Sequence, residues 1–219
     1  MIQLKNFSST FLDIYRKLIG EAYIQNPEVL KAIAKVPRAH FTPMEYRSQA
    51  EVNTALPISC GQTISQPYIV AYMTEQLMPV RDKKILEIGT GSGYQAAILA
   101  YLGAKVYSVE RIAELAQSAR IQLDDLGMYG VQIKEGDGSL GWSENSPYDA
   151  VIVTAASQSG VPKSLVAQLK IEGKMIIPIL DSALQQEYLY LLTKKSLWHM
   201  DSQQLIPVRF VPLIVTGDS

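Results

Sequence analysis

Apolar side chains recur at helical spacing near the start of the chain. From Ser8 to Tyr23 they fall every three or four residues, which is the period of an amphipathic helix with one buried face. The positions are Phe11, Leu12, Tyr15, Leu18, Ile19 and Ala22. The pattern predicts a helix that packs against the rest of the protein.

A second helix and a long irregular segment are predicted next. Asn26 is followed by Pro27, a residue favoured in the first turn of a helix. The apolar side of this helix comprises Val29, Leu30 and Ile33. Residues 36–67 then contain Pro37, Pro43, Pro57, Gly61 and Pro67, which indicates an irregular course over the surface. Because proline is tolerated in a first turn, Pro67 is expected to open a helix that ends near Leu77.

From Lys83 onward, strand patterns alternate with helical ones. The expected strands are Lys84–Ile88, Val106–Glu110, Val131–Glu135, Ala150–Thr154 and Lys174–Ile179, and a helix is expected over Ile112–Leu126. Nearly unbroken apolar runs such as AVIV and MIIPI are typical of parallel strands buried on both faces. Glu187–Thr193 and Val208–Ile214 have strand patterns with no clear helix between them, which predicts an antiparallel edge. Pro212 indicates that the last run lies at a sheet margin or contains a bulge.

Composition and charge narrow the class of protein. The chain has 219 residues, 47% of them hydrophobic and 19% charged, which is ordinary for a globular protein with one main core. Twenty basic and twenty-one acidic residues leave a net charge of -1, so no nucleic-acid partner is expected. No signal peptide or membrane span is expected either. The single cysteine, Cys60, excludes an internal disulfide, and His40 and His199 lack metal-ligand spacing. We therefore expect a soluble cytoplasmic protein without a metal.

A glycine loop carries the most informative local pattern. The strand in KILEIGTGSGYQAAILA runs into Gly89, Gly91 and Gly93 and then into an alanine-rich helix. Glycines let backbone N–H groups approach a ligand closely, and the G-x-G-x-G spacing differs from the dinucleotide pattern G-x-G-x-x-G. Glu87, two residues before the loop, would repel a pyrophosphate and attract the ammonium of a methionine moiety. The pattern favours S-adenosylmethionine over NAD.

Further polar residues follow the next two strands. Glu110 ends the strand after the glycine loop, 17 residues beyond Gly93, where it can accept hydrogen bonds from two ribose hydroxyls. Asp137 and Gly138 occupy the turn after the third strand. Because the carboxyl ends of parallel strands open onto one crevice, these residues are predicted to meet at a single cofactor site.

Specific motifs extend from about residue 25 to residue 215. They are VPRAHF, LPISCGQTISQPYIVAYMTEQL, ILEIGTGSGYQAAILA, YSVERI, GDG, YDAVIVTAA and VRFVPL. Together they resemble the protein-L-isoaspartate (D-aspartate) O-methyltransferases. The resemblance implies an α/β, Rossmann-like S-adenosylmethionine-dependent methyltransferase fold, with a mostly parallel central sheet, helices on both faces, an antiparallel C-terminal edge and an N-terminal helical extension. It implies one domain over residues 1–219, with N-terminal helices and the substrate segment in residues 1–80 and the cofactor-binding core in residues 81–219.

The resemblance also implies roles for individual residues. In that family a threonine, an isoleucine and a serine lie over the transferred methyl group, which implies the same for Thr63, Ile64 and Ser65. Ser65 is the implied active-site residue. Glu110 would hold the ribose, the turn that begins at Asp137 would lie near the adenine, and the three loop glycines would wrap the methionine portion.

The implied reaction transfers a methyl group from S-adenosylmethionine to the side-chain carboxylate of L-isoaspartyl residues in damaged proteins. The reaction initiates repair and releases S-adenosylhomocysteine. An alkyl carboxylate has a pKa near ~4 and is ionised at neutral pH, so it needs no general base. Ser65 is then expected to orient the carboxylate with a hydrogen bond. The alternative role for its side chain is an N-cap of the helix that begins near Pro67.

Several substrate-side loops depart from the family pattern. Ser59 and Cys60 stand where glycine and another residue are common, SQSGVP replaces a proline-rich turn, IEGK replaces a double glycine, and PIL lacks an expected glycine. Two alternatives therefore stay open: a methyltransferase for another carboxylate, and a catalytically silent cofactor-binding protein. The expected partners are isoaspartyl proteins and peptides, and the chain is expected to be a monomer that binds neither nucleic acid nor membrane.

Overall fold

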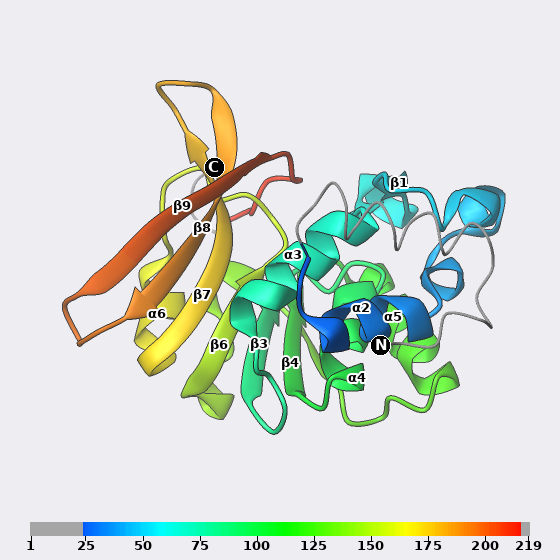
Figure 1. The fold of residues 1–219 in the computed structure, drawn as a ribbon, viewed down its shortest axis with the longest axis horizontal. Helices are drawn as coiled ribbons and strands as arrows, with labels where there is room; N and C mark the ends of the chain where they lie inside the picture. The colour runs from blue at the N-terminus through cyan, green and yellow to red at the C-terminus, as the bar shows by residue number, and fades with distance from the viewer. Residues whose placement is uncertain (1–23, 216–219) are drawn as a thin grey trace.

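Seven strands form the central sheet in the part of the chain that the structure, a computed structural model, describes: residues 24–215 (Figure 1). In spatial order they are β5 (Gln132–Glu135), β4 (Lys105–Glu110), β3 (Lys84–Ile88), β6 (Tyr148–Val153), β7 (Leu169–Asp181), β8 (Gln186–Lys194) and β9 (Met200–Val208). The first five strands are parallel, and β8 and β9 add antiparallel pairs at one edge. The predicted parallel sheet with an antiparallel C-terminal edge is confirmed.

The order of the strands reverses at β3. The chain adds β4 and β5 on one side of β3 and then crosses to its other side to form β6 and β7. β3 has a parallel neighbour on each side, and its residues Ile85 and Leu86 have no exposed surface. In open parallel sheets such a reversal creates a crevice outside the carboxyl ends of the strands, where ligands bind.

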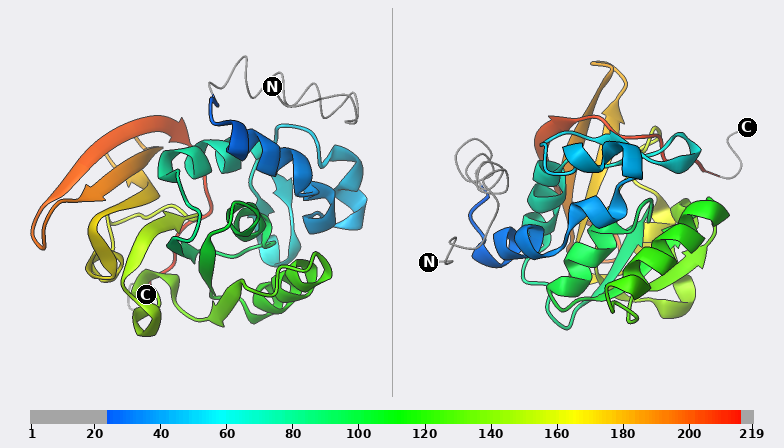
Figure 2. Two further views of the ribbon diagram at one scale, coloured as in Figure 1. Left: turned by 60° about the horizontal axis from the view of Figure 1, so that its bottom comes forward. Right: turned by 90° about the vertical axis from the view of Figure 1, so that its right-hand side faces the viewer.

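Helices cover both faces of this sheet. They are α2 (Pro27–Lys35), α3 (Pro67–Leu77), α4 (Tyr94–Tyr101), α5 (Ala113–Asp125) and α6 (Lys163–Ala167). Residues of α2, α3 and α4 share one apolar core with Ile85, whereas Leu165 of α6 belongs to a second core with Leu86. Neighbouring residues of a strand point to opposite faces, so the two cores lie on opposite sides of the sheet. Figure 2 shows α2 and α3 side by side on one of these faces.

The predicted helices within the described range are confirmed. α2 begins at Pro27, and the Asn26 side chain accepts hydrogen bonds from the N–H groups of Glu28 and Val29 at 3.0 and 3.3 Å. Its predicted apolar residues Val29, Leu30 and Ile33 are buried. The N-terminal helix predicted over residues 8–23 lies outside the described residues.

The irregular segment 36–67 is confirmed, but it contains a small hairpin that the sequence pattern did not predict. β1 (Leu56–Pro57) pairs antiparallel with β2 (Thr63–Ile64). The 3-10 turns of this segment are η2 (Arg38–Phe41), η3 (Met44–Gln49) and η4 (Ser59–Gly61). Strands of two residues are too short to show the alternation by which strands are recognised.

The strand predicted over Val208–Ile214 is wrong. The last strand is β9, which ends at Val208, and within the following segment Pro212 makes only an isolated parallel bridge with Ala156. β9 was not predicted because Asp201 to Gln204 are polar and exposed, so the sequence shows no apolar face there. The strand is specified by its antiparallel pairing with β8 rather than by burial.

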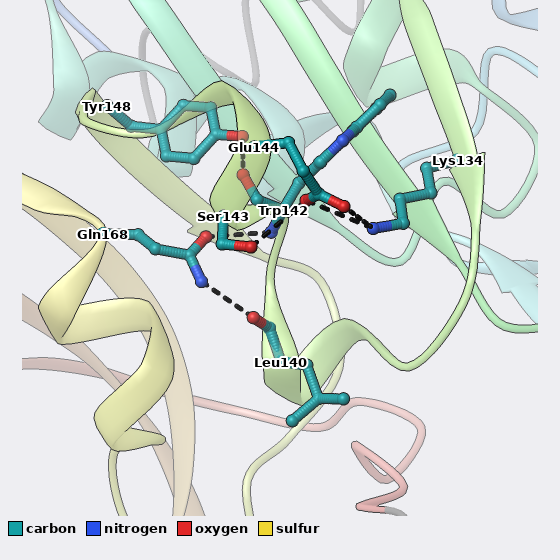
Figure 3. Close-up of polar contacts among 7 residues, drawn as sticks. All are labelled: Lys134, Leu140, Trp142, Ser143, Glu144, Tyr148 and Gln168. Atoms are coloured by element: carbon teal, nitrogen blue, oxygen red, sulfur yellow. Dashed lines mark hydrogen bonds and ion pairs between the residues drawn. The ribbon is translucent and has the colours of Figure 1, made fainter.

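The connection from β5 to β6 contains two 3-10 turns, η5 (Gly138–Leu140) and η6 (Ser143–Asn145), and no α-helix. Figure 3 shows how it is held: Gln168 accepts a hydrogen bond from the Trp142 N–H at 2.8 Å and donates one to the Leu140 carbonyl at 2.8 Å. The Tyr148 hydroxyl donates to the Trp142 carbonyl at 2.6 Å. These bonds fix the path of the segment just after Gly138, where the chain leaves the carboxyl end of β5.

Candidate functional site

A cavity of about 230 Å³ opens at the carboxyl ends of the parallel strands. Its wall is formed by the loops after β3, β4, β5 and β6, by the hairpin and α3, and by the segment after β9. The sequence-predicted site residues in the wall are Thr63, Ile64, Ser65, Gly89, Gly91, Glu110 and Gly138. Glu87, Gly93 and Asp137 lie outside the wall. The fold therefore brings most of the predicted residues, from separate segments, to one place.

The loop glycines have backbone torsions that other residues avoid. The φ angle is +92° at Gly89, +53° at Gly91 and +90° at Gly93. A Cβ atom at Gly89 would lie 2.5 Å from Thr154 Oγ1, and one at Gly93 would lie 3.3 Å from the Ala119 Cβ. Gly89 and Gly93 therefore allow close packing against the end of β6 and against α5. Gly91 borders the cavity and presents its backbone there.

Glu110 connects the end of β4 to the glycine loop. Its Oε2 accepts a hydrogen bond from the Gly91 N–H at 2.9 Å, and its Oε1 accepts one from the Ile112 N–H at 3.0 Å. The side chain is buried but still lines the cavity. Because a carboxylate has about four acceptor sites, two N–H groups fix its position and leave acceptors for the hydroxyl groups of a ligand.

Glu87 lies buried beneath the glycine loop. The Ser108 hydroxyl donates to Glu87 Oε2, and Thr90, which lines the cavity, is hydrogen-bonded to the same Ser108 hydroxyl at 2.6 Å. Glu87 Oε1 has no hydrogen-bond partner among residues 24–215. Burial raises the pKa of Glu87 to about 8, and the hydrogen bond from Ser108 opposes the shift. A positive charge bound in the cavity would favour the ionised form of this carboxyl group.

Asp137 and Gly138 form the turn after β5. Asp137 Oδ1 accepts hydrogen bonds from the N–H and the hydroxyl of Ser139 at 2.8 and 2.7 Å, which caps the 3-10 turn η5 (Gly138–Leu140). A Cβ atom at Gly138 would collide with the Ile88 side chain. Glycine is therefore required for Gly138 to form the cavity wall, while Asp137 shapes the turn from outside that wall.

Ser65 stands between the hairpin and helix α3. The preceding residue, Ile64, is buried, and α3 begins at Pro67 with Gln66 as its N-cap. The Gln66 side chain makes no capping hydrogen bond, and the Tyr68 N–H of the first turn donates instead to Asn53 Oδ1 at 3.0 Å. The alternative role of Ser65 as an N-cap is therefore wrong, because the residue precedes the cap position and its hydroxyl does not bond the first turn. Ser65 instead lines the cavity.

Parts of the cavity wall were not predicted from the sequence. Thr154 and Ala155 follow β6, Tyr94 and Gln95 begin α4, and Val211 to Ile214 come from the segment after β9. The strand-end rule that singled out the acidic residue after β4 also applies to β6 and could have identified Thr154. The residues after β9 were not predicted to line the cavity, because a strand was wrongly predicted over Val208–Ile214.

The chemistry of the wall fits S-adenosylmethionine. Glu110 offers acceptors for hydroxyl groups, Gly91 presents backbone, and Thr90 connects the wall through Ser108 to the buried Glu87. The apolar part of the wall includes Ile69, Val70, Met73, Leu115 and Leu213. A cavity with one apolar side and a few convergent polar groups suits a ligand that combines an aromatic base, a sugar and a charged end.

Between residues 24 and 215, no three His, Cys, Asp or Glu side chains are grouped so that they could hold a metal ion. Within the same range, no helix has both the length and the apolar character needed to cross a membrane.

The reversal at β3, the glycine loop and the acidic end of β4 define the class as a Rossmann-like S-adenosylmethionine-dependent methyltransferase. The model of the protein-L-isoaspartate(D-aspartate) O-methyltransferase family matches residues 11–217, and the chain belongs to this family. A protein-L-isoaspartate O-methyltransferase from Dictyoglomus turgidum is 54% identical over 216 residues, which cover 97% of this chain and 96% of the relative.

Solved structures share the fold. A protein-L-isoaspartate O-methyltransferase matches with a TM-score of 0.83 at 28% identity, and the match covers 92% of this chain and 65% of that chain. A Plasmodium falciparum protein described as a protein-L-isoaspartate O-methyltransferase, in complex with S-adenosyl-L-homocysteine, matches with a TM-score of 0.81 at 24% identity. That match covers 92% of this chain and 97% of the other, and it supports the fold.

Proposed function

We propose that the protein methylates the side-chain carboxylate of L-isoaspartyl residues in damaged proteins and peptides, with S-adenosylmethionine as the methyl donor and S-adenosylhomocysteine as the product. Membership of the family supports this reaction. The observation that carries it for this chain is that Ser65 and Glu110 line the same cavity, although they come from a hairpin end and a strand end. The first suits an acceptor carboxylate and the second suits a ribose.

The donor side of the site is built from the strand ends. The residues that we assign to the donor are Thr63, Ile64, Glu87, Gly89, Gly91, Gly93, Glu110, Asp137 and Gly138. When bound, S-adenosylmethionine supplies a methyl group on a positively charged sulfur that is a good leaving group. Glu87 is separated from the cavity by the hydroxyls of Ser108 and Thr90, and its raised pKa keeps it largely protonated at neutral pH until a bound positive charge above the loop favours its ionised form.

The acceptor side needs orientation rather than a base. An isoaspartyl carboxylate is already ionised at neutral pH, because its pKa is near ~4. The Ser65 hydroxyl donates a hydrogen bond that turns one carboxylate oxygen toward the methyl group, and the hairpin limits the access of water. Correct alignment of this kind can lower the activation free energy by roughly 7 to 11 kcal/mol. The resulting ester has a better leaving group than the free acid, and its spontaneous cyclisation starts the repair.

We also propose that the protein works as a monomer in the cytoplasm. The thiol of Cys60 is exposed, and a reducing compartment would keep such a thiol intact. Sedimentation of the purified protein and fractionation of the source cells would test these two points.

A substrate panel tests the proposed function. Purified protein and labelled donor are incubated with an isoaspartyl peptide, its normal aspartyl isomer and a set of small carboxylic acids. Base-labile label on the isoaspartyl peptide alone supports the proposal. Label on another acid would favour the methyltransferase for a different carboxylate, and binding of the donor without transfer would favour a catalytically silent protein.

A further inference from the structure

Arg38, in η2, is a buried arginine whose guanidinium holds several backbone carbonyl groups. Nη1 donates to the Ala50 carbonyl at 2.7 Å, and Nη2 donates to the Thr54 and Ser65 carbonyls at 2.8 and 3.0 Å. The same Nη2 reaches the Ile64 carbonyl at 3.4 Å. The residue is only 6% exposed, and no carboxylate within residues 24–215 forms an ion pair with it.

These carbonyl groups lie on both sides of the β1–β2 hairpin. Ala50 and Thr54 precede the hairpin, whereas Ile64 ends it and Ser65 directly follows it. The guanidinium therefore connects the segment that enters the hairpin to the segment that leaves it. The tip of this hairpin has left-handed backbone torsions, and the residues that leave it line the cavity. We infer that Arg38 is a positioning residue, which clamps the base of the hairpin and thereby holds Ser65 in place for the acceptor carboxylate.

The clamp requires the shape of an arginine side chain. A guanidinium presents five N–H donors in a rigid plane, whereas a lysine ammonium has three donors at a single point. Burial lowers the pKa of Arg38 to about 10, so the side chain stays charged at neutral pH. A buried charge without a counter-ion is costly, and the carbonyl groups offset this cost only while they remain in position. The site therefore favours one arrangement of the hairpin base.

The same turn also contacts the donor side. Phe41, at the end of η2, packs against the ring of Tyr94 with ring centroids 5.7 Å apart. Tyr94 is the first residue of α4 and lines the cavity directly after the glycine loop. η2 thus contacts the hairpin through Arg38 and helix α4 through Phe41. The inference rests on the proposed function, because Ser65 is assigned there to the acceptor.

Two substitutions separate the clamp from the charge. Arg38→Lys keeps the positive charge but loses the planar set of N–H donors, whereas Arg38→Met loses both. We expect kcat for an isoaspartyl peptide to fall roughly 10- to 100-fold in both variants, since a displacement of about 1 Å has this effect on an aligned reaction. The dissociation constant for S-adenosylhomocysteine is expected to change less than about threefold, because the strand ends remain intact. Wild-type kcat in Arg38→Lys, or an equal loss of product affinity and kcat, would overturn the inference.

Arg47 provides the matched control. It is exposed, belongs to the neighbouring turn η3, and also donates to a backbone carbonyl, that of Thr42 at 3.3 Å. Arg47→Lys is expected to leave kcat within about twofold of the wild type, because exposed substitutions of this kind have small effects. A loss in Arg47→Lys equal to that in Arg38→Lys would also contradict the clamp.

Hydrogen exchange gives a second measurement that does not depend on activity. The Ile58 N–H is bonded to the Gln62 carbonyl within the hairpin, and the His40 N–H is bonded to the Pro37 carbonyl within η2, each at 2.9 Å. In Arg38→Lys saturated with S-adenosylhomocysteine, we expect the Ile58 amide to exchange at least about tenfold faster than in the wild type. An unchanged rate would overturn the clamp.

The wild-type protein decides the question if the variants do not fold. There the Ile58 and His40 amides should exchange at similar rates, because a clamped hairpin opens together with η2. Much faster exchange at Ile58 would contradict the inference. If the wild type binds S-adenosylhomocysteine but does not methylate isoaspartyl peptides, the proposed function fails, while the exchange measurements still decide whether Arg38 holds the hairpin.

Discussion

Replacing Glu87 by glutamine tests the buried carboxyl group beneath the glycine loop. Glutamine has nearly the same shape and can still accept the hydrogen bond from Ser108, but it has no titrating proton. The substitution therefore removes the cost of a buried charge while most contacts remain. We expect the variant to be more stable than the wild type at alkaline pH and to bind the cofactor product less tightly.

The size of the effect follows from the pKa of Glu87. Burial raises this pKa from 4.5 to about 8, so the folded protein keeps a proton that the unfolded chain has already lost. The stability that this proton contributes is fully present below about pH 4.5 and is lost as the pH rises through about 8. Since one pKa unit corresponds to about 1.36 kcal/mol, the loss between pH 5 and pH 8 amounts to roughly 3 to 4 kcal/mol.

Urea unfolding of both proteins from pH 5 to pH 8 measures this loss. Other groups titrate equally in the two proteins, so the difference between their free energies of unfolding isolates Glu87. We expect the advantage of Glu87→Gln to grow with pH by roughly 3 to 4 kcal/mol. A difference that stays constant within about 1 kcal/mol would refute the reasoning about the buried carboxyl group.

Four further substitutions test other parts of the account. Ser65→Ala should lower kcat roughly 10- to 100-fold with little change in melting temperature, because one hydrogen bond to a charged group is lost and no cap is removed; unchanged turnover would exclude its role. Glu110→Gln should weaken binding of S-adenosylhomocysteine roughly 10- to 100-fold by calorimetry. The substitution replaces one carboxylate oxygen, which accepts hydrogen bonds, by an NH2 group, which can only donate them. Gly138→Ala should lower both product affinity and stability because its methyl group meets Ile88, and unaltered binding would contradict the packing. Lys194→Met should destabilise the protein by roughly 2 to 4 kcal/mol in urea, because the buried ammonium donates to the carbonyl groups of Val166 in α6 and Leu169 at the start of β7.

The cofactor half of the fold could be predicted because its signals are local. The apolar run before Gly89 requires a buried strand, and the glycines that follow adopt left-handed torsions. Parallel strands then bring their carboxyl ends together, so the sequence alone predicted that Glu110 and Gly138 meet. Pro27 and Pro67 likewise marked the starts of α2 and α3.

The rest depends on contacts between distant segments. β9 is an exposed edge strand that pairs with β8, so its polar residues gave no apolar alternation. The position of Ser65 depends on Arg38, 27 residues earlier in the chain, whose bonds go to backbone carbonyl groups that no residue type reveals. The burial that raises the pKa of Glu87 is similarly set by the packing above the strand, and the sequence showed only that an acid precedes the loop.

A single-turnover experiment follows the methyl group from the bound donor to the acceptor carboxylate. The protein is first loaded with one equivalent of S-adenosylmethionine labelled in its methyl group and then mixed with an isoaspartyl peptide or with the aspartyl peptide of the same sequence. We expect the label to move to the isoaspartyl peptide as a base-labile ester and the aspartyl isomer to stay unlabelled. Equal labelling of both peptides, or none despite measured binding of the donor, would contradict the proposed function.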